Sequence, residues 1–312
     1  MKRREILALA ALTAGMATSA RAWSQTSPVS RTPRLVVVGG AEDRLQDRLI
    51  LRRFADYCGG SQARIRLITA ARSEPQNARQ SYQKVFEALG VQQFEPLPLD
   101  DRESAARPEV VEGILQADGI FISGGDQSRL MQVLWETPAY AALHEAFHLR
   151  GCCIGGTSAG AAVMSRHMIA QGPAVLRPRK EVTTTDIGLG LLSSAVVDQH
   201  FSERRRLARL LSTLALRPDL LGVGIDEDTA LVVERGLAVE VIGQGSVTLV
   251  DTSRMQSNVD ELDAEDQIEM LGVVLHSLPA GRRYSLMAGG KRWPAPLERA
   301  LRRLVEPGPL RG

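Results

Sequence analysis

The sequence predicts an α/β fold with a mostly parallel sheet sandwiched by helices. Between residues 34 and 225, short apolar runs typical of strands alternate with longer segments whose apolar residues follow a helical spacing. Leu35-Val36-Val37-Val38 is a continuous apolar run ended by Gly39-Gly40, which indicates a strand buried on both faces. Strands separated by helices favour a parallel sheet with helices on both sides.

The other elements follow from the same periodicities. Further strands are expected at 65–68, 94–97, 119–122, 196–197 and 223–225, with another leading into the turn after Cys152. Helices are expected at 45–57, 82–89, 109–117 and 138–149. The C-terminal part differs, because apolar runs that flank tight turns predict two hairpins, at 231–241 and 273–286. After Lys291 we expect a peripheral helix.

Composition limits the possible functions. A chain of 312 residues, 44% hydrophobic and 24% charged, suits one large globular domain. The formal net charge of +2 gives no reason to expect a nucleic acid or a membrane surface as partner. The three cysteines, Cys58, Cys152 and Cys153, are expected to be small buried hydrophobes. Neither a C-x-x-C metal pattern nor a G-x-G-x-x-G dinucleotide motif is present, so we expect no metal and no cofactor.

The N-terminal segment has the pattern of a signal peptide. Basic residues at 2–4 precede a short apolar stretch, and Ala20-Arg21-Ala22 forms a cleavage site before Trp23. Arg3-Arg4 is equally compatible with a twin-arginine signal and an ordinary secretory signal. We therefore expect an exported protein, periplasmic or extracellular. Its predicted organisation is a signal peptide (1–22), a linker (23–33), an α/β domain (34–290) and a basic C-terminal tail (291–312).

Gly156-Thr157-Ser158-Ala159-Gly160 matches the G-x-S-x-G pattern of a nucleophile elbow. A serine on a sharp strand-to-helix turn projects its hydroxyl from the sheet, and the close approach of strand and helix requires small neighbours. The Ala159 amide would then lie at a helix N-terminus, where it can stabilise an oxyanion. The alternative interpretation is a glycine-rich structural turn.

A serine nucleophile needs a base and an acid that orients the base. His200 ends the expected strand 195–200, at the edge where loops of an open α/β sheet gather. The strand at 223–225 is followed by Asp226, Glu227 and Asp228, and spacing alone does not choose among these acids. The order serine, histidine, acid differs from that of α/β-hydrolases. The glycines in Gly124-Gly125-Asp126, at another strand end, would let backbone amides complete an oxyanion hole.

A cluster of arginines follows His200. Ser202 is a good N-cap for a helix with an apolar face at Leu207, Leu210, Leu211 and Leu214. Arginines at 204–206 in its first turn would oppose the helix dipole. An anion, either a substrate carboxylate or nearby acids, would offset them; a solvated charge run is an equally weighted interpretation.

His144-Glu145-Ala146-Phe147-His148 matches H-E-x-x-H and sits on a predicted helix, which raises a zinc peptidase as a rival hypothesis. No Glu or Asp lies between Arg150 and Lys180 to act as the usual next ligand, and His167 is the only candidate there. We therefore favour a structural helix that covers the sheet.

Taken together, several motifs resemble one family. They are Gly39-Gly40-Ala41-Glu42-Asp43, Gly119–Gln127, Gly155–Ala161, Asp198-Gln199-His200-Phe201 and Gly224–Ala230. In this order they resemble the motifs of cyanophycinases, serine exopeptidases of the dipeptidase E group, from about Arg34 to Gly281. The resemblance implies a fold related to glutamine amidotransferases, a homodimer, and hydrolysis of cyanophycin to β-Asp-Arg dipeptides. Cyanophycin is a poly-aspartate chain with arginine on each side-chain carboxyl; other β-aspartyl peptides are the alternative substrates.

The resemblance also implies roles for individual residues. Ser158 would be the nucleophile, His200 the base and Glu227 the orienting acid. The expected oxyanion hole comprises Gly125, Asp126 and Ala159. The residues expected to line the substrate pocket are Gln127, Asp198, Gln199, Arg204, Arg206 and Arg209.

Overall fold

The structure is a computed structural model that describes residues 32–287 and 289–306. The predicted signal peptide and nearly all of the predicted linker lie outside the described residues. Within the described part of the chain, no helix has both the length and the apolar character needed to cross a membrane.

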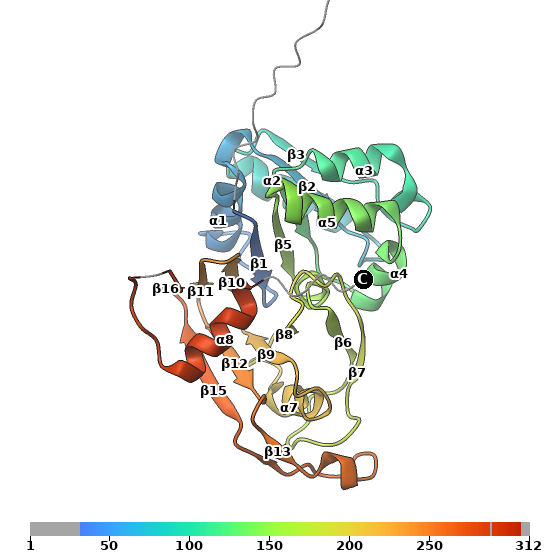
Figure 1. The fold of residues 1–312 in the computed structure, drawn as a ribbon. Helices are drawn as coiled ribbons and strands as arrows, with labels where there is room; N and C mark the ends of the chain where they lie inside the picture. Colours follow the sequence, from blue (N-terminus) through green and yellow to red (C-terminus); the bar gives the residue numbers. More distant parts are fainter. Residues whose placement is uncertain (1–31, 288, 307–312) are drawn as a thin grey trace, which may run out of the picture.

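The main sheet has eight strands in the order β16-β11-β10-β1-β5-β4-β2-β3 (Figure 1). Its parallel part consists of β1 (Arg34–Val38), β5 (Cys153–Thr157), β4 (Gly119–Ile122), β2 (Arg64–Ile68) and β3 (Gln93–Pro96). The antiparallel extension consists of β10 (Thr229–Glu234), β11 (Ala238–Gly243) and β16 (Arg282–Ser285). The predicted α/β class is confirmed.

Helices cover both faces of this sheet, as predicted. Alternate residues of β1 enter two separate cores, Val36 and Val38 on one side and Leu35 and Val37 on the other. The first core is closed by α1 (Leu49–Cys58) and α2 (Gln76–Ala88). The second core is closed by α3 (Pro108–Leu115), α4 (Gln127–Leu134), α5 (Pro138–Arg150) and the C-terminal α8 (Ala295–Val305). The predicted C-terminal helix therefore contributes its apolar face to the main core.

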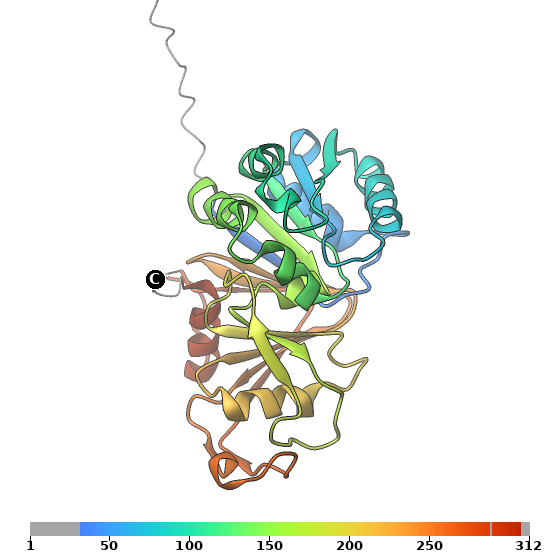
Figure 2. The same cartoon turned by 90° about the vertical axis from the view of Figure 1, so that its right-hand side faces the viewer.

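A second sheet was not predicted. Its four strands run in the order β15-β12-β9-β8: β15 (Val274–Pro279), β12 (Ser246–Asp251), β9 (Leu221–Ile225) and β8 (Ala195–Gln199). Helix α7 (Leu207–Leu216) packs on it through Leu210 and Leu214. The strands expected at 196–197 and 223–225 therefore belong to this sheet, which lies below the main sheet in Figures 1 and 2.

The hairpin at 231–241 is confirmed by the antiparallel pairing of β10 with β11. The second predicted hairpin is wrong, because β15 pairs with β12 while β16 pairs with β11. The connection at residues 280–281 thus passes from one sheet to the other. Smaller pairs are formed by β6 (His167–Gln171) with β7 (Thr184–Ile187), and by β13 (Gln256–Ser257) with β14 (Met270–Leu271).

The first two helices begin at residues other than those predicted. The first helix begins at Leu49 instead of residue 45, because the Asp43 carboxylate accepts hydrogen bonds from the amides of Leu45, Gln46 and Arg48 and holds a turn there. These backbone hydrogen bonds lower the pKa of Asp43 to about 2. Helix α2 begins earlier than residue 82, at Gln76.

Candidate active site

Ser158 occupies the sharp turn between β5 and the short helix α6 (Ala159–Ala162). Its backbone is strained, with φ 54° and ψ −111°, which is the conformation that projects a nucleophile from such a turn. The small neighbours are required: a Cβ on Gly156 would lie 2.4 Å from the carbonyl oxygen of Gly160, and one on Gly160 would lie 2.3 Å from that of Ile122. The segment therefore has the geometry of a nucleophile elbow, in agreement with its spacing.

His200 and Glu227 lie beside this serine. The Oγ of Ser158 is 2.9 Å from Nε2 of His200, and Nδ1 of His200 is 2.6 Å from Oε1 of Glu227. His200 follows β8 and is only 8% exposed, while Glu227 follows β9. The histidine can therefore accept the serine proton at one ring nitrogen while the carboxylate fixes the tautomer at the other.

The other two acids of this strand end have different partners. Asp226 is buried and joins two elements: Oδ1 accepts from Ser202, and Oδ2 accepts from the amide and hydroxyl of Ser246. Asp228 accepts from the amide of Asp43, and burial raises the pKa of its carboxyl. Of the three candidates that the spacing left open, Glu227 is the one that contacts His200.

The segment 38–43, from the end of β1 onward, contacts Ser158, His200 and Asp228, the residue after Glu227; we call it the β1 loop. The carbonyl of Val38 accepts from the Ser158 amide (3.1 Å), and the carbonyl of Gly39 accepts from the His200 amide (2.7 Å). The carbonyl of Gly40 accepts from the Asp228 amide (2.9 Å). Gly40 also supports the imidazole, since a Cβ there would lie 2.2 Å from Cε1 of His200.

Glu42, within the β1 loop, contacts the residue that precedes Ser158. Its side chain is buried, and its carboxylate accepts from the hydroxyls of Tyr82 (2.6 Å) and Thr157 (2.5 Å). Nε of Arg44 lies 3.7 Å away and provides the nearest opposite charge. Burial, and secondarily the charge of Glu42, raises the pKa of Tyr82 well above its usual value, so the phenol keeps its proton. Thr157, the residue before Ser158, is thereby hydrogen-bonded to the β1 loop.

The predicted oxyanion hole needs one correction. The Asp126 amide donates to the carbonyl of Ala71 (2.8 Å), and its carboxylate caps α4, so both groups already have partners other than an oxyanion at Ser158. Within the described residues, no carbonyl accepts from the amides of Gly125 or Ala159. Ala159 begins the helix directly after Ser158, and these two amides remain the candidate oxyanion donors.

Part of the predicted substrate pocket is an internal ion-pair network. Asp198 is 1% exposed and Arg209 is 5% exposed, and they form a two-point salt bridge with distances of 2.9 and 2.5 Å. Arg206 lies 3.4 Å from Asp198 and donates to the side chain and carbonyl of Gln199, which is itself buried. Asp198, Gln199 and Arg209 therefore do not line an open pocket, contrary to our prediction, because they satisfy one another's buried charges and dipoles.

The arginine cluster also differs from the prediction. Helix α7 begins at Leu207, so residues 204–206 precede the helix. Ser202 does not cap α7, because its hydroxyl donates to the carboxylate of Asp226. The anion that offsets the charge of Arg206 is the nearby acid Asp198, and nearby acids were one of the two sources of negative charge that we considered. Burial lowers the pKa of Arg206 to about 10, although Asp198 opposes the shift, and the guanidinium stays charged at neutral pH.

The two remaining predicted pocket residues are more accessible. Arg204 is exposed, and none of the described acids forms an ion pair with it. Gln127 is half-buried at the start of α4, and its amide nitrogen donates to the carbonyls of Ile169 and Ala170. Arg204 and Arg205, and in part Arg206, are thus the cations of this cluster that a ligand can reach.

The H-E-x-x-H helix forms part of α5. The rings of His144 and His148 stack with centroids 5.5 Å apart, and the guanidinium of Arg235 contacts Nδ1 of His148. Burial, with help from Arg235 and His144, lowers the pKa of His148 to about 4. Glu145 is paired with Arg150. Among the described residues, no third side chain joins these histidines to form a metal-binding group.

Sequence reasoning missed the role of the β1 loop. Glu42 and Thr157 were visible only as parts of longer motifs. The available signal was position: carboxylates that follow a parallel strand lie at the edge where ligands bind in α/β sheets. Glu42 follows β1, which is paired directly with the strand of the elbow.

Comparison with known proteins indicates the same class of protein as the geometry of the site. An α/β protein with a serine on an elbow, a histidine and a carboxylate in this order has the features of a serine hydrolase. Residues 35–241 match the profile of peptidase family S51. The chain belongs to this family and is a serine-type peptidase.

The similar proteins cover most of the chain. It is 38% identical to the cyanophycinase of a Nostoc species over 86% of this chain and 90% of that protein. It is 39% identical to the cyanophycinase of Geminocystis herdmanii over 80% of this chain and 93% of that protein. The crystal structure of a peptidase from an acI-B1 actinobacterium matches with a TM-score of 0.59 and 25% identity, covering 82% of this chain and 97% of the other. The family predicted from the motifs is confirmed.

Proposed function

We propose that this protein hydrolyses cyanophycin to β-Asp-Arg dipeptides, with Ser158 as nucleophile, His200 as base and Glu227 as orienting acid. The observation that carries this proposal is the continuous path from Ser158 through His200 to Glu227, with distances of 2.9 and 2.6 Å. The relatives named cyanophycinase support the choice of substrate.

The chemistry follows from this path. His200 Nε2 takes the proton of the Ser158 hydroxyl as its oxygen attacks the scissile carbonyl carbon, and the carbonyl oxygen becomes an oxyanion facing the amides of Gly125 and Ala159. The tetrahedral intermediate collapses to an acyl-enzyme when the amine leaves with the proton from His200. Water then attacks the ester carbon while His200 takes one of its protons, and the Ser158 oxygen leaves with that proton from His200, which releases the acid product and restores the serine.

Substrate recognition is assigned to the accessible cations beside His200. Each cyanophycin unit carries the α-carboxylate of its arginine, and a guanidinium fork matches the geometry of a carboxylate. Arg204 and the partly buried Arg206 are suited to this contact. The network of Asp198 and Arg209 lies behind Arg206 and fixes its position.

Incubation of the purified protein with cyanophycin tests this function directly. We expect β-Asp-Arg to be the main product by mass spectrometry, and we expect no product from Ser158→Ala. Cleavage of other β-aspartyl peptides without cleavage of the polymer would favour the alternative substrate class. Hydrolysis of neither class by folded protein would refute the proposal.

A further inference from the structure

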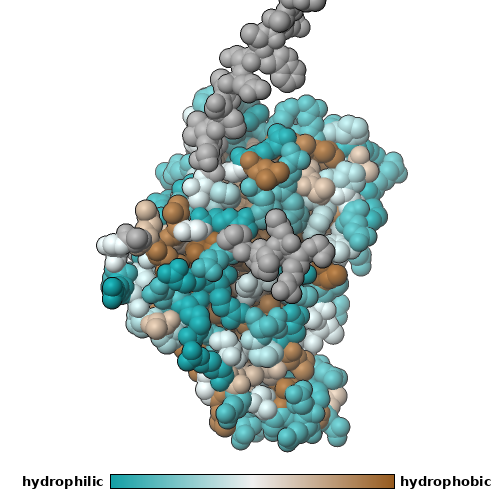
Figure 3. All heavy atoms as spheres, in the orientation of Figure 1, coloured by the Kyte–Doolittle hydropathy of each residue, from teal (hydrophilic) through white to brown (hydrophobic). Residues whose placement is uncertain are grey.

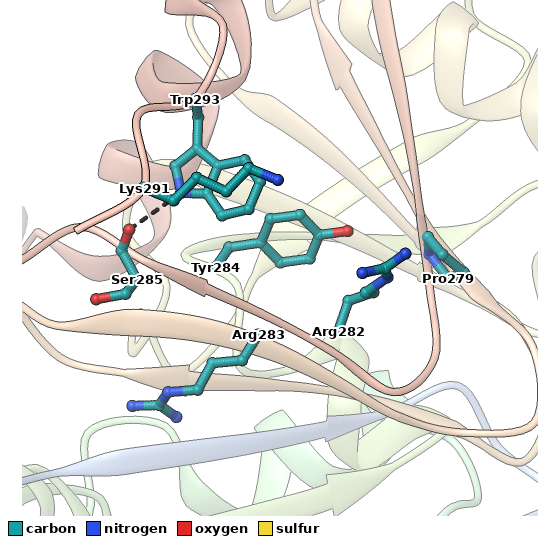
Figure 4. Close-up of a pocket in the computed structure, with 7 residues that line it drawn as sticks. All are labelled: Pro279, Arg282, Arg283, Tyr284, Ser285, Lys291 and Trp293. Carbon is teal, nitrogen blue, oxygen red and sulfur yellow. Dashed lines mark hydrogen bonds between the residues drawn. The ribbon is translucent and has the colours of Figure 1, made fainter.

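A pocket of about 500 Å³ lies beside β16, the edge strand of the main sheet (Figure 4). It is lined by Pro279, Arg282, Arg283, Tyr284, Ser285, Lys291 and Trp293. In Figure 3 the surface over α8 is mostly hydrophilic, with a smaller hydrophobic patch beside it. None of these residues belongs to the active site described above.

Two aromatic rings give the pocket a fixed floor. The rings of Tyr284 and Trp293 pack with centroids 4.9 Å apart. The indole Nε1 donates to the carbonyl of Ser285 (3.0 Å), which fixes the orientation of the tryptophan. Tyr284 is buried and belongs to the main core through its register partner Val239. The floor is therefore anchored to the sheet and does not depend on a ligand for its shape.

Two uncompensated cations border this floor. Arg282 and Lys291 are exposed, and no carboxylate among the described residues forms an ion pair with either of them. Nζ of Lys291 lies 4.6 Å from the centroid of the Trp293 ring, and Figure 4 shows the tyrosine hydroxyl directed toward Arg282. Arg283 differs, since it points the other way and is paired with Glu234 and Glu240. Cations without partners favour a carboxylate group of the ligand.

The pocket is connected to the acid side of the active site. Pro279, at its rim, is the register partner of Ser246 in the pairing of β12 with β15. Ser246 donates to the carboxylate of Asp226, the residue before Glu227. Both strands belong to the second sheet, in which β8 and β9 are followed by His200 and Glu227.

We propose that this pocket is a second attachment site for the polymer substrate, where Arg282 and Lys291 bind α-carboxylates of units that are not being cleaved. The proposal rests on the proposed function. An exopeptidase that holds a long chain at a second point raises the effective concentration of the chain end at the nucleophile, without any new contact at the triad. Binding of this kind weakens with salt, because exposed charges are screened.

Binding is tested in the inactive Ser158→Ala background with cyanophycin as the probe. Adding Arg282→Gln and Lys291→Gln should weaken binding about tenfold at low salt and reduce its salt dependence. The matched control adds Lys84→Gln and Arg254→Gln, which remove the same charge from exposed residues elsewhere. Equal binding by the pocket variant and the control would overturn the proposal.

Turnover separates this proposal from the proposed function. In active protein, the ratio of kcat/KM on the polymer to kcat/KM on a two-unit fragment should fall about tenfold in the pocket variant and stay constant in the control. An equal loss on both substrates would overturn the second site, since it would place the damage at the triad. If the intact protein cleaves neither substrate, the proposed function fails, and the binding assay still decides the role of the pocket.

Discussion

The proposed nucleophile and the proposed base–acid pair are built in different ways. Ser158 belongs to the main sheet, and its position is set within one short segment by backbone strain and glycine contacts. His200 and Glu227 follow β8 and β9 of the second sheet, and they reach the serine only because the two sheets meet at the β1 loop. The first half is a local construction, whereas the second depends on contacts between residues far apart in the sequence. Substitutions can test each half and the joint between them, by which we mean the β1 loop (residues 38–43).

The largest effect on hydrolysis is expected at Ser158 and His200, where the two halves of the site are in direct contact. Ser158→Ala should keep the fold and lower hydrolysis by roughly 10³-fold or more, as in other serine triads, and His200→Ala should cost about as much. Glu227→Gln should cost less, because the acid only orients and stabilises the imidazolium. The double variant Ser158→Ala, His200→Ala should be little worse than either single variant, since the two residues act as a unit. Rates on cyanophycin, with circular dichroism to verify folding, provide the measurement.

Near-normal hydrolysis by folded Ser158→Ala would show that the elbow is only a turn. An additive loss in the double variant would instead mean that the halves work independently. Either result would contradict the view that Ser158 and the His200–Glu227 pair form one site, and the chemistry would then be sought first at His144 and His148.

The contrast also explains what the sequence could predict. The elbow was predictable because G-x-S-x-G reports local geometry, and the strand at β1 was predictable from its apolar run. The second sheet was not predictable, because β8 and β9 have the same pattern as strands of the main parallel sheet. They do pair in parallel with each other, and only the long-range pairing of β9 with β12 places them in a separate sheet. The burial of Asp198 was missed for the same reason: its partner Arg209 lies on the following helix, and whether the pair faces a ligand or the interior depends on packing.

Gly40→Ala tests the joint on the side of the base. The glycine has φ +104°, and a Cβ would lie 2.2 Å from the His200 ring, so the imidazole must move. We expect kcat to fall by about 10²-fold, since displacements near 1 Å can cost this much. Gly236→Ala is the matched control, because this glycine also has positive φ (+72°) but has nothing within 4 Å of the added carbon. Equal kinetics for the two variants would show that the joint tolerates movement.

Glu42→Gln tests the joint on the side of the nucleophile. The substitution keeps the shape of the side chain but replaces one acceptor oxygen of the two that bind Tyr82 and Thr157. We expect kcat to fall about tenfold with KM little changed, because Glu42 positions Thr157 and does not touch the substrate. Thr157→Val should give a similar loss, and Thr157→Ser should restore most of kcat.

Glu234→Gln provides the control for Glu42. Glu234 is a carboxylate of equal exposure, 5%, but it pairs with Arg34 and Arg283 at the far end of β10. Its substitution should lower the free energy of unfolding, by about 1–3 kcal/mol, and leave kcat near normal. If both variants lose only stability, the role of Glu42 is confined to folding.

The smallest effect on activity is expected at His148, which lies on α5, a helix that covers one face of the main sheet. Its pKa is about 4 in the folded protein and 6.5 ordinarily, so the unfolded chain binds the proton first as the pH falls. The stability that neutral His148 confers is therefore present above pH 6.5 and is lost as the pH falls toward 4. Because the side chain is only partly buried, solvent screening reduces this loss to about 1 kcal/mol. Urea unfolding at pH 7 and pH 4.5 should show wild type losing this much relative to His148→Gln, while turnover at pH 7 stays within about twofold and EDTA has no effect. Stoichiometric zinc, with activity lost on chelation, would contradict this and transfer the chemistry from the joint between the sheets to α5.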